Sequence, residues 1–161
     1  MSGTRAVVKS IGMSVPDRIL TNDDLAKLVD TTDEWIRQRT GIAERRICAD
    51  DETASTLATR ASLEALDRAS VDPNDLDMIV VGTVTGDMPF PATSCLVQEN
   101  IGAKRAGAFD VGAACAGFIY SVATAASMIE NGQISRALVV GVDVLSKFVD
   151  WTDRSTCVLF G

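Results

Sequence analysis

Cys115 is the side chain of this sequence best suited to attack a carbonyl carbon. It lies in DVGAACAGF (110–118), where a short apolar run leads through small residues into a helical pattern. The N–H groups and positive dipole at a helix N-terminus favour a thiolate, so they lower a thiol pKa from its free value of about 8.5 and stabilise an oxyanion on an attacked thioester. The pattern predicts the thiol counterpart of a nucleophile elbow.

A buried structural cysteine is the alternative interpretation of the same position. Free cysteines are among the most buried residues and are usually inert, and the small neighbours of Cys115 do not exclude this role by themselves. The other cysteines stand at 48, 95 and 157, and no C-x-x-C pair and no histidine is present. A zinc site is therefore not expected, and we expect free thiols, as in a cytoplasmic protein.

The composition indicates a globular protein with no nucleic-acid or membrane partner. The 161 residues carry a net charge of -7, and 47% of them are hydrophobic. A nucleic-acid binder normally presents a basic surface. No apolar run approaches the roughly 18 residues of a membrane span, and the first ten residues do not resemble a secretory signal.

Apolar runs alternate with helical patterns along the chain. Strands are predicted at 6–15, 78–84, 106–111, 137–144 and 155–160, and helices at 21–29, 32–39, 53–69, 92–101 and 115–131. This alternation predicts an α/β layered fold with a largely parallel central sheet. Because domains rarely end on an apolar strand, we expect the chain to be one piece of a longer protein.

Four motifs carry a resemblance to a known family. They are DTTDEWIRQRTGIAERRI (30–47), FDVGAACAGF (109–118), ALVVGVDVLS (137–146) and TDRSTCVLFG (152–161). Together they resemble the N-terminal half of the β-ketoacyl-acyl carrier protein synthase III family, which has a thiolase-like fold. The resemblance covers essentially the whole chain. It implies that residues 1–161 form one half of a two-half αβαβα architecture with a mixed, mostly parallel sheet.

The resemblance also implies a reaction. Cys115 would take an acyl group from coenzyme A, and decarboxylative Claisen condensation with malonyl-acyl carrier protein would follow, which initiates fatty acid synthesis. The family completes this site with a histidine and an asparagine from its second half, and this chain contains no histidine. Condensation is therefore expected to need the missing half. The family implies a homodimer that uses acyl-CoA as a substrate and holds no permanent cofactor.

A coenzyme A site is implied by further matches. Trp35 and Arg154 match the pair that sandwiches the adenine, a role that suits a planar guanidinium and an aromatic ring. Three more residues match the same binding region: Thr31, Arg39 and Thr40. Phe90 matches an aromatic residue that shapes the partner's acyl pocket across the dimer interface. Ser155 departs from the family's usual glycine beside the coenzyme, which leaves the acyl preference open.

Other interpretations of these residues and of the chain stay open. Trp35 could be a core anchor, and the arginines at 37, 39, 45 and 46 could form a solvated face that balances nearby carboxylates. The chain could instead belong to a thiolase-fold acyltransferase acting on an amine or alcohol, or be a non-catalytic half that binds acyl-CoA or serves as a scaffold. A half of a larger fold is expected to expose apolar surface.

Overall fold

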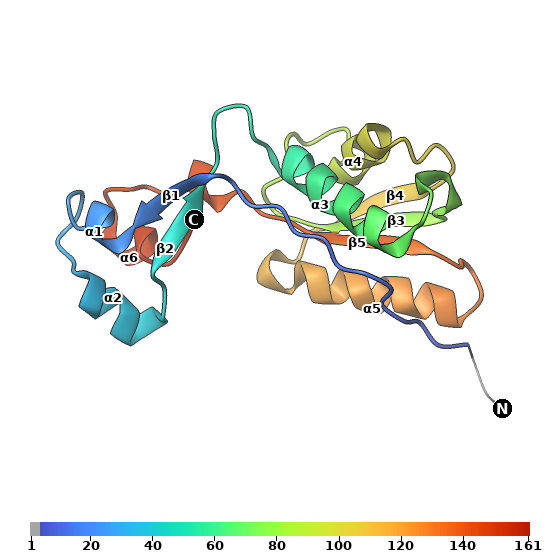
Figure 1. The fold of residues 1–161 in the computed structure, drawn as a ribbon, viewed down its shortest axis with the longest axis horizontal. Coiled ribbons are helices and arrows are strands. Elements are labelled where there is room, and N and C mark those ends of the chain that lie inside the picture. Colours follow the sequence, from blue (N-terminus) through green and yellow to red (C-terminus); the bar gives the residue numbers. More distant parts are fainter. Residues whose placement is uncertain (1–3) are drawn as a thin grey trace. The chain divides into compact units, whose positions relative to one another are not determined.

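The computed structural model describes residues 4–161, which form two compact units (Figure 1). The first, here called the sheet unit, contains the described residues up to Ser14 together with Thr53–Asp143. The second, here called the small unit, contains Val15–Glu52 and Val144–Gly161. Each unit has a hydrophobic core of its own.

A parallel sheet lies at the centre of the sheet unit. Its strands are β3 (Met78–Gly82), β4 (Gly107–Val111) and β5 (Ala137–Gly141), in the order β4-β3-β5 within the described residues. Both neighbouring pairs are parallel. The strands read as nearly continuous apolar runs because helices cover both faces of the sheet. The predicted α/β fold with a parallel sheet is confirmed.

Helices form the outer layers of the sheet unit. Figure 1 shows α3 (Ala54–Ala69) and α4 (Thr93–Ile101) on one face of the sheet and α5 (Gly117–Glu130) on the other. Thr53 starts α3 with a capping box in which its side chain accepts a hydrogen bond from the Thr56 N–H. The core between α3, α4 and the sheet contains Ala58, Leu66, Ile79, Val81, Val97, Ile101, Leu138 and Val140.

The small unit combines a two-stranded antiparallel ribbon with short helices. The ribbon pairs β1 (Arg18–Thr21) with β2 (Glu44–Ile47), and neither strand was predicted from the sequence. The helices are α1 (Asn22–Leu25), α2 (Asp33–Thr40) and α6 (Arg154–Cys157). Their shared core is formed by Leu25, Ile36, Cys157 and Val158.

The strand predicted at 6–15 is absent from the described residues. This segment instead lies along α3, where the Ser10 hydroxyl donates to the Ala65 carbonyl at 2.6 Å and Arg68 donates to the Ile11 carbonyl at 2.6 Å. A β-branched apolar run satisfies the local requirements of a strand, but a strand also needs a neighbouring edge with which to pair. That partner cannot be read from the local pattern.

The strand predicted at 155–160 is also wrong. The chain forms the short helix α6 there, because the Asp153 side chain accepts hydrogen bonds from the Ser155 N–H at 2.9 Å and the Thr156 hydroxyl at 2.8 Å. An aspartate at the N-cap satisfies the free N–H groups of a first helical turn. This cap outweighs the strand preference of the β-branched residues that follow.

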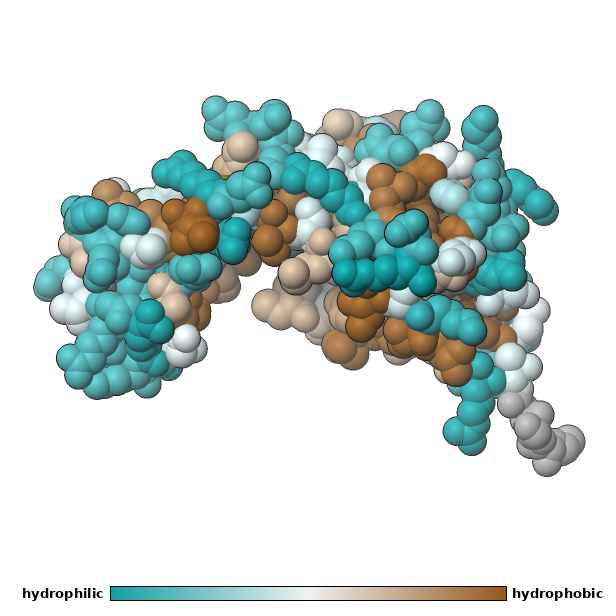
Figure 2. Space-filling model, viewed as in Figure 1, coloured by the Kyte–Doolittle hydropathy of each residue, from teal (hydrophilic) through white to brown (hydrophobic). Residues whose placement is uncertain are grey.

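Apolar side chains lie exposed on both units, as expected for half of a larger fold. In Figure 2 hydrophobic residues reach the surface where α5 lies in Figure 1. The exposed set includes Val7, Val8, Ile11, Met13, Leu28, Phe90, Phe118, Ile119, Tyr120 and Phe148. Among residues 4–161, no helix combines the length and the apolar character needed to cross a membrane.

Replacing Gly82 with alanine is expected to destabilise the sheet unit. A Cβ at Gly82 would lie 2.5 Å from the backbone carbon of Gly117, a contact that forces the backbone to shift. Overpacking of this kind costs roughly 1–3 kcal/mol, and urea unfolding measures the loss. Gly112→Ala is the matched control, because a Cβ there meets nothing within 4 Å. Equal unfolding midpoints for the two variants would contradict the packing argument.

Acid is expected to weaken the start of α1. Hydrogen bonds from Lys27 and Thr21 lower the pKa of Asp24 from 3.8 to about 2. Because the folded-state pKa lies below the unfolded value, this stabilisation is present above pH 3.8 and is lost as the pH falls towards 2. Asp24→Asn should therefore lower Tm at pH 5, and the difference from the unsubstituted protein should shrink at pH 2. Asp23→Asn, in the same turn, is the control for loss of one carboxylate: it leaves the hydrogen bonds of Asp24 in place, so its Tm at pH 5 should stay closer to that of the unsubstituted protein.

Candidate functional site

Cys115 lies beyond the carboxyl edge of the parallel sheet. In register, Gly82 at the end of β3 is opposite Val111 of β4 and Gly141 of β5, so the three strands end together. Ligands of open α/β sheets bind outside this edge. From Val111 the chain passes through a 3-10 turn, Ala114–Ala116, into α5, and Cys115 is at the centre of that turn.

The Cys115 side chain is exposed, so it is not sealed in the core of the sheet unit as the structure describes it. Its neighbour Ala114 has a φ of 45°, in the left-handed region that non-glycine residues seldom adopt. Such strain is common at functional sites. The predicted helix at 115–131 begins two residues late, at Gly117, and no side chain caps its first turn. Within residues 4–161, no N-cap side chain therefore accepts a hydrogen bond from its first N–H groups.

Close backbone packing fixes the position of this turn. Gly117 lies against Gly82, and a Cβ at Gly82 would meet the Gly117 carbonyl oxygen at 2.8 Å. A Cβ at Gly141 would likewise lie 2.8 Å from the Phe118 Cβ. The glycines that end β3 and β5 therefore allow the first turn of α5 to rest directly on the sheet. Cys115 precedes this contact by two residues.

Two carboxylates that sequence analysis did not single out organise the loops at the same edge. The two Asp110 oxygens accept from the N–H groups of Thr93 and Ser94, each at 2.8 Å, and so hold the start of α4 against β4. Asp143 Oδ1 accepts from the Val84 N–H at 3.0 Å and thereby fixes the loop after β3. Asp110 is the penultimate residue of β4 and Asp143 lies two residues after the end of β5, and this closeness to strand ends was the available signal.

Phe90 and the remaining cysteines differ in their accessibility. Phe90, in the segment between β3 and α4, is 87% exposed, so it is free to meet another surface. Each of the four cysteines is free; Cys48 and Cys95 are half-buried, and Cys157 is buried. Burial raises the pKa of the Cys157 thiol, which disfavours its nucleophilic thiolate. Cys115 is the most accessible of the four.

The small unit contains a surface cleft of about 660 Å³. Five of the predicted coenzyme-binding residues line it together with three others: Trp35, Arg39, Thr40, Arg154 and Ser155, joined by Asp153, Val158 and Leu159. Thr31 is not among the lining residues, and its Oγ1 is buried without a hydrogen-bond partner in the described part of the chain. The structure thus brings together most of the residues that the motif matches predicted.

Trp35 is flanked by two guanidinium groups. Arg154 Cζ lies 4.1 Å from the centroid of the Trp35 ring, and Arg39 Cζ lies 4.9 Å from it. These are cation–π distances. A planar base can lie between Trp35 and Arg154 only if the indole ring and the guanidinium are about 7 Å apart, which is twice a normal contact distance. Arg154, which is exposed, must therefore move aside before a base can be sandwiched there.

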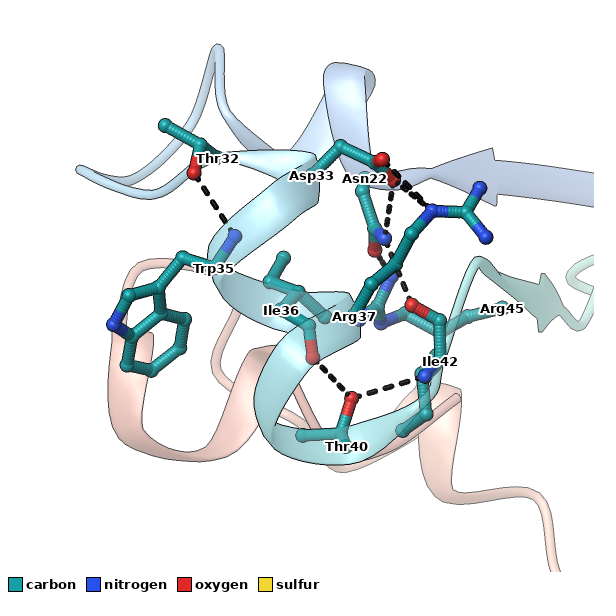
Figure 3. Close-up of polar contacts among 9 residues, drawn as sticks. All are labelled: Asn22, Thr32, Asp33, Trp35, Ile36, Arg37, Thr40, Ile42 and Arg45. Atoms are coloured by element: carbon teal, nitrogen blue, oxygen red, sulfur yellow. Dashed lines mark hydrogen bonds and ion pairs between the residues drawn. The ribbon is translucent and has the colours of Figure 1, made fainter.

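Side-chain caps hold α2, which carries Trp35, in place (Figure 3). The Thr32 hydroxyl accepts from the Trp35 N–H at 3.1 Å at the start of the helix. At its end the Thr40 hydroxyl donates to the Ile36 carbonyl at 2.8 Å and accepts from the Ile42 N–H at 3.0 Å. The helix stops at Gly41, whose φ of 74° suits glycine.

The N-cap of α6 supports the wall of the cleft that carries Arg154, across from the wall that α2 forms. The Ser155 hydroxyl donates to Asp153 at 2.7 Å, and this bond, with those from the Ser155 N–H and Thr156, lowers the pKa of Asp153. Asp153 therefore stays ionised and holds the turn that carries Arg154. The hydroxyl of Ser155 is therefore engaged in this cap.

The hypothesis of a solvated arginine face is wrong for Arg45. Arg37 and Arg39 are exposed, but Arg45 is only 4% exposed, and burial lowers its pKa. Alternate residues of a strand point to opposite faces. In β2, Arg45 and Ile47 accordingly point inwards. This two-residue alternation was the signal in the sequence, but four residues with two adjacent arginines did not suggest a buried strand.

The sequence is similar to known proteins over most of its length. The sequence model of 3-oxoacyl-[acyl-carrier-protein (ACP)] synthase III matches residues 109–161. A β-ketoacyl-[acyl-carrier-protein] synthase III of Symbiobacterium thermophilum is 56% identical over 154 residues, which are 96% of this chain and 47% of that protein. One from Xanthomonas campestris is 53% identical over the same share of each chain.

Solved structures agree with these relatives. The crystal structure of 3-oxoacyl-[acyl-carrier-protein] synthase III from Aquifex aeolicus matches with a TM-score of 0.92 and 52% identity, covering 95% of this chain and 49% of that one. The prediction of one half of a thiolase-like fold is thereby confirmed. The chain thus matches the N-terminal half of β-ketoacyl-[acyl-carrier-protein] synthase III proteins and spans about half the length of the curated relatives that it matches.

Proposed function

We propose that this chain supplies the acyl-accepting half of a β-ketoacyl-[acyl-carrier-protein] synthase III that initiates fatty acid synthesis. The observation that carries the proposal is the exposed Cys115 thiol at the carboxyl edge of the sheet, in a strained turn that precedes an uncapped helix. A nucleophile placed in this way meets a substrate from solvent. The helix start provides N–H groups for the developing oxyanion.

The first step is transfer of an acyl group to Cys115. The thiolate Sγ attacks the thioester carbonyl of acyl-CoA, and its electron pair forms the new carbon–sulfur bond. The tetrahedral oxyanion collapses, the bond to the coenzyme sulfur breaks, and coenzyme A leaves as a thiolate that takes up a proton. The products are an acyl-enzyme at Cys115 and free coenzyme A.

Condensation completes the proposed reaction. Malonyl-acyl carrier protein loses CO2, and the resulting enolate carbon attacks the acyl carbonyl, which releases the Cys115 thiolate and forms a β-ketoacyl product. In the family a histidine and an asparagine assist this step. This chain has no histidine, so we assign that assistance to the second half of the fold.

We assign the cleft of the small unit to the adenine nucleotide of coenzyme A. Trp35 provides an aromatic face, and Arg39 and Arg154 provide guanidinium groups beside it. Guanidinium groups suit both stacking on a base and binding of phosphate. The other proposed ligands of this region are Thr40 and Ser155 on the cleft wall and Thr31 nearby in the sequence.

The proposed setting is a cytoplasmic homodimer without a permanently bound cofactor. Four free thiols suit a reducing compartment. The exposed aromatic ring of Phe90 suits a contact with a second subunit, where aromatic residues are enriched. Through that contact Phe90 would shape the partner's acyl pocket.

Acetyl-CoA is expected to leave an acetyl group on Cys115, visible as a gain in intact mass. Cys115→Ser should abolish this thioester adduct, whereas Cys95→Ala, which removes a half-buried thiol, should keep it. An adduct that survives in Cys115→Ser would contradict the assignment. If the unsubstituted chain forms no adduct even with the second half supplied, the non-catalytic interpretation is favoured. Acyl transfer to amines or alcohols in place of malonyl-acyl carrier protein would favour the other acyltransferase.

Trp35→Ala is expected to weaken binding of coenzyme A about tenfold, because a desolvated cation–π or stacking contact contributes roughly 1–2 kcal/mol. Isothermal titration with coenzyme A measures the change in Kd. Trp151→Phe is the control, because Trp151 packs against the core of the small unit and does not line the cleft. Unchanged affinity in Trp35→Ala would show that the coenzyme binds elsewhere.

A further inference from the structure

We propose that Arg45 is a positioning residue that joins the two walls of the coenzyme cleft from behind. The inference rests on the function proposed for that cleft. One wall is built by α2, which carries Trp35 and Thr40, and the other by α6 and the turn after it, which carry Arg154 and Val158. More than a hundred residues separate these walls in the sequence, so only tertiary contacts set the width of the cleft.

Arg45 reaches the second wall directly. Its Nη2 donates to the carbonyl oxygen of Val158 at 2.6 Å, and Val158 lines the cleft. Val158 directly follows α6, the helix that begins with Arg154. A hydrogen bond at this point therefore holds the end of the helical turn from which the stacking guanidinium extends.

Arg45 reaches the first wall through Asn22 (Figure 3). Its Nη1 donates to the Asn22 Oδ1 at 2.6 Å, and Asn22 Nδ2 donates in turn to the Ile42 carbonyl and to Asp33, each at 2.8 Å. Ile42 donates its N–H to the Thr40 hydroxyl at 3.0 Å. The network thus contacts α2 at its first residue, Asp33, and at its last, Thr40.

Because it is buried, this bridge requires the guanidinium group of an arginine. Arg45 is 4% exposed and Asn22 is 1% exposed, so water does not replace the hydrogen bonds between them. The bridge uses the two terminal nitrogens of one planar guanidinium, while Arg45 Nε has no hydrogen-bond partner among residues 4–161. A lysine presents a single nitrogen on a flexible stem and does not reproduce this fork. Arg45→Lys therefore keeps the charge and removes the bridge.

The test compares two thioesters in the acetylation of Cys115. Acetyl-CoA carries the adenine nucleotide, and acetyl-pantetheine presents the same thioester without it. Arg45→Lys should raise the half-saturating concentration of acetyl-CoA about tenfold, because small losses of positioning have large effects on productive binding. The maximal rate and the reaction with acetyl-pantetheine should stay unchanged. A general structural defect would affect both thioesters alike.

Arg46→Lys is the matched control. Arg46 is the next residue of β2, its side chain is 40% exposed, and it donates to the Pro16 carbonyl away from the cleft lining. This variant should retain normal kinetics with both thioesters. Asn22→Ser breaks the same bridge at its other end and should reproduce the selective loss with acetyl-CoA, which keeps the test valid if Arg45→Lys fails to fold.

Each outcome has a distinct meaning. Normal half-saturation by acetyl-CoA in a folded Arg45→Lys, or an equal loss with both thioesters, would overturn the positioning role while leaving the proposed function intact. If the unsubstituted protein shows no preference for acetyl-CoA over acetyl-pantetheine and no binding of coenzyme A, the cleft assignment fails, and the inference fails with it.

Discussion

The first turn of α5 rests on the ends of β3 and β5 with no space for a side chain between them. Gly82 and Gly141 create this contact, and their register with Val111 places three strand ends at one level. A helix that begins here must start directly above the sheet edge. The turn before it is consequently short, which places Ala114 in a left-handed conformation and leaves Cys115 at the surface. The chemistry proposed for the thiol depends on this backbone contact.

The cleft of the small unit is constructed differently, from polar side chains that end or begin helices. Thr32, Thr40 and Asp153 each satisfy backbone or hydroxyl groups at a helix terminus. Short helices have few internal hydrogen bonds and depend on such caps and on tertiary packing. Arg45 adds a buried bridge between them. The positions of Trp35 and Arg154 thus depend on a polar network as well as on the apolar core against which Trp35 packs.

The sequence predicted those features that are encoded locally. The apolar runs of β3, β4 and β5 and the helical spacing of α3 identified the fold class. The small residues around Cys115 suggested an accessible thiol but did not exclude a buried one. Pairing over long distances could not be predicted: the segment at 6–15 has strand composition but lies along α3. The Asp153 cap was decisive at α6 and was overlooked. The burial of Arg45 was equally hidden, because it depends on Val158, which lies 113 residues away.

The contact between Arg154 and Trp35 has a thermodynamic consequence. At 4.1 Å from the ring centroid the guanidinium already covers one face of the indole. A base that binds as proposed must displace the guanidinium, so its net affinity reflects the difference between two stacking free energies and not the whole of either. Arg154 loses the free energy of its contact with Trp35 and recovers part of it only by stacking on the outer face of the base. Planar heterocycles that are broad enough to contact both groups are favoured over compact ones, which gives the cleft a size threshold set by the protein's own side chain.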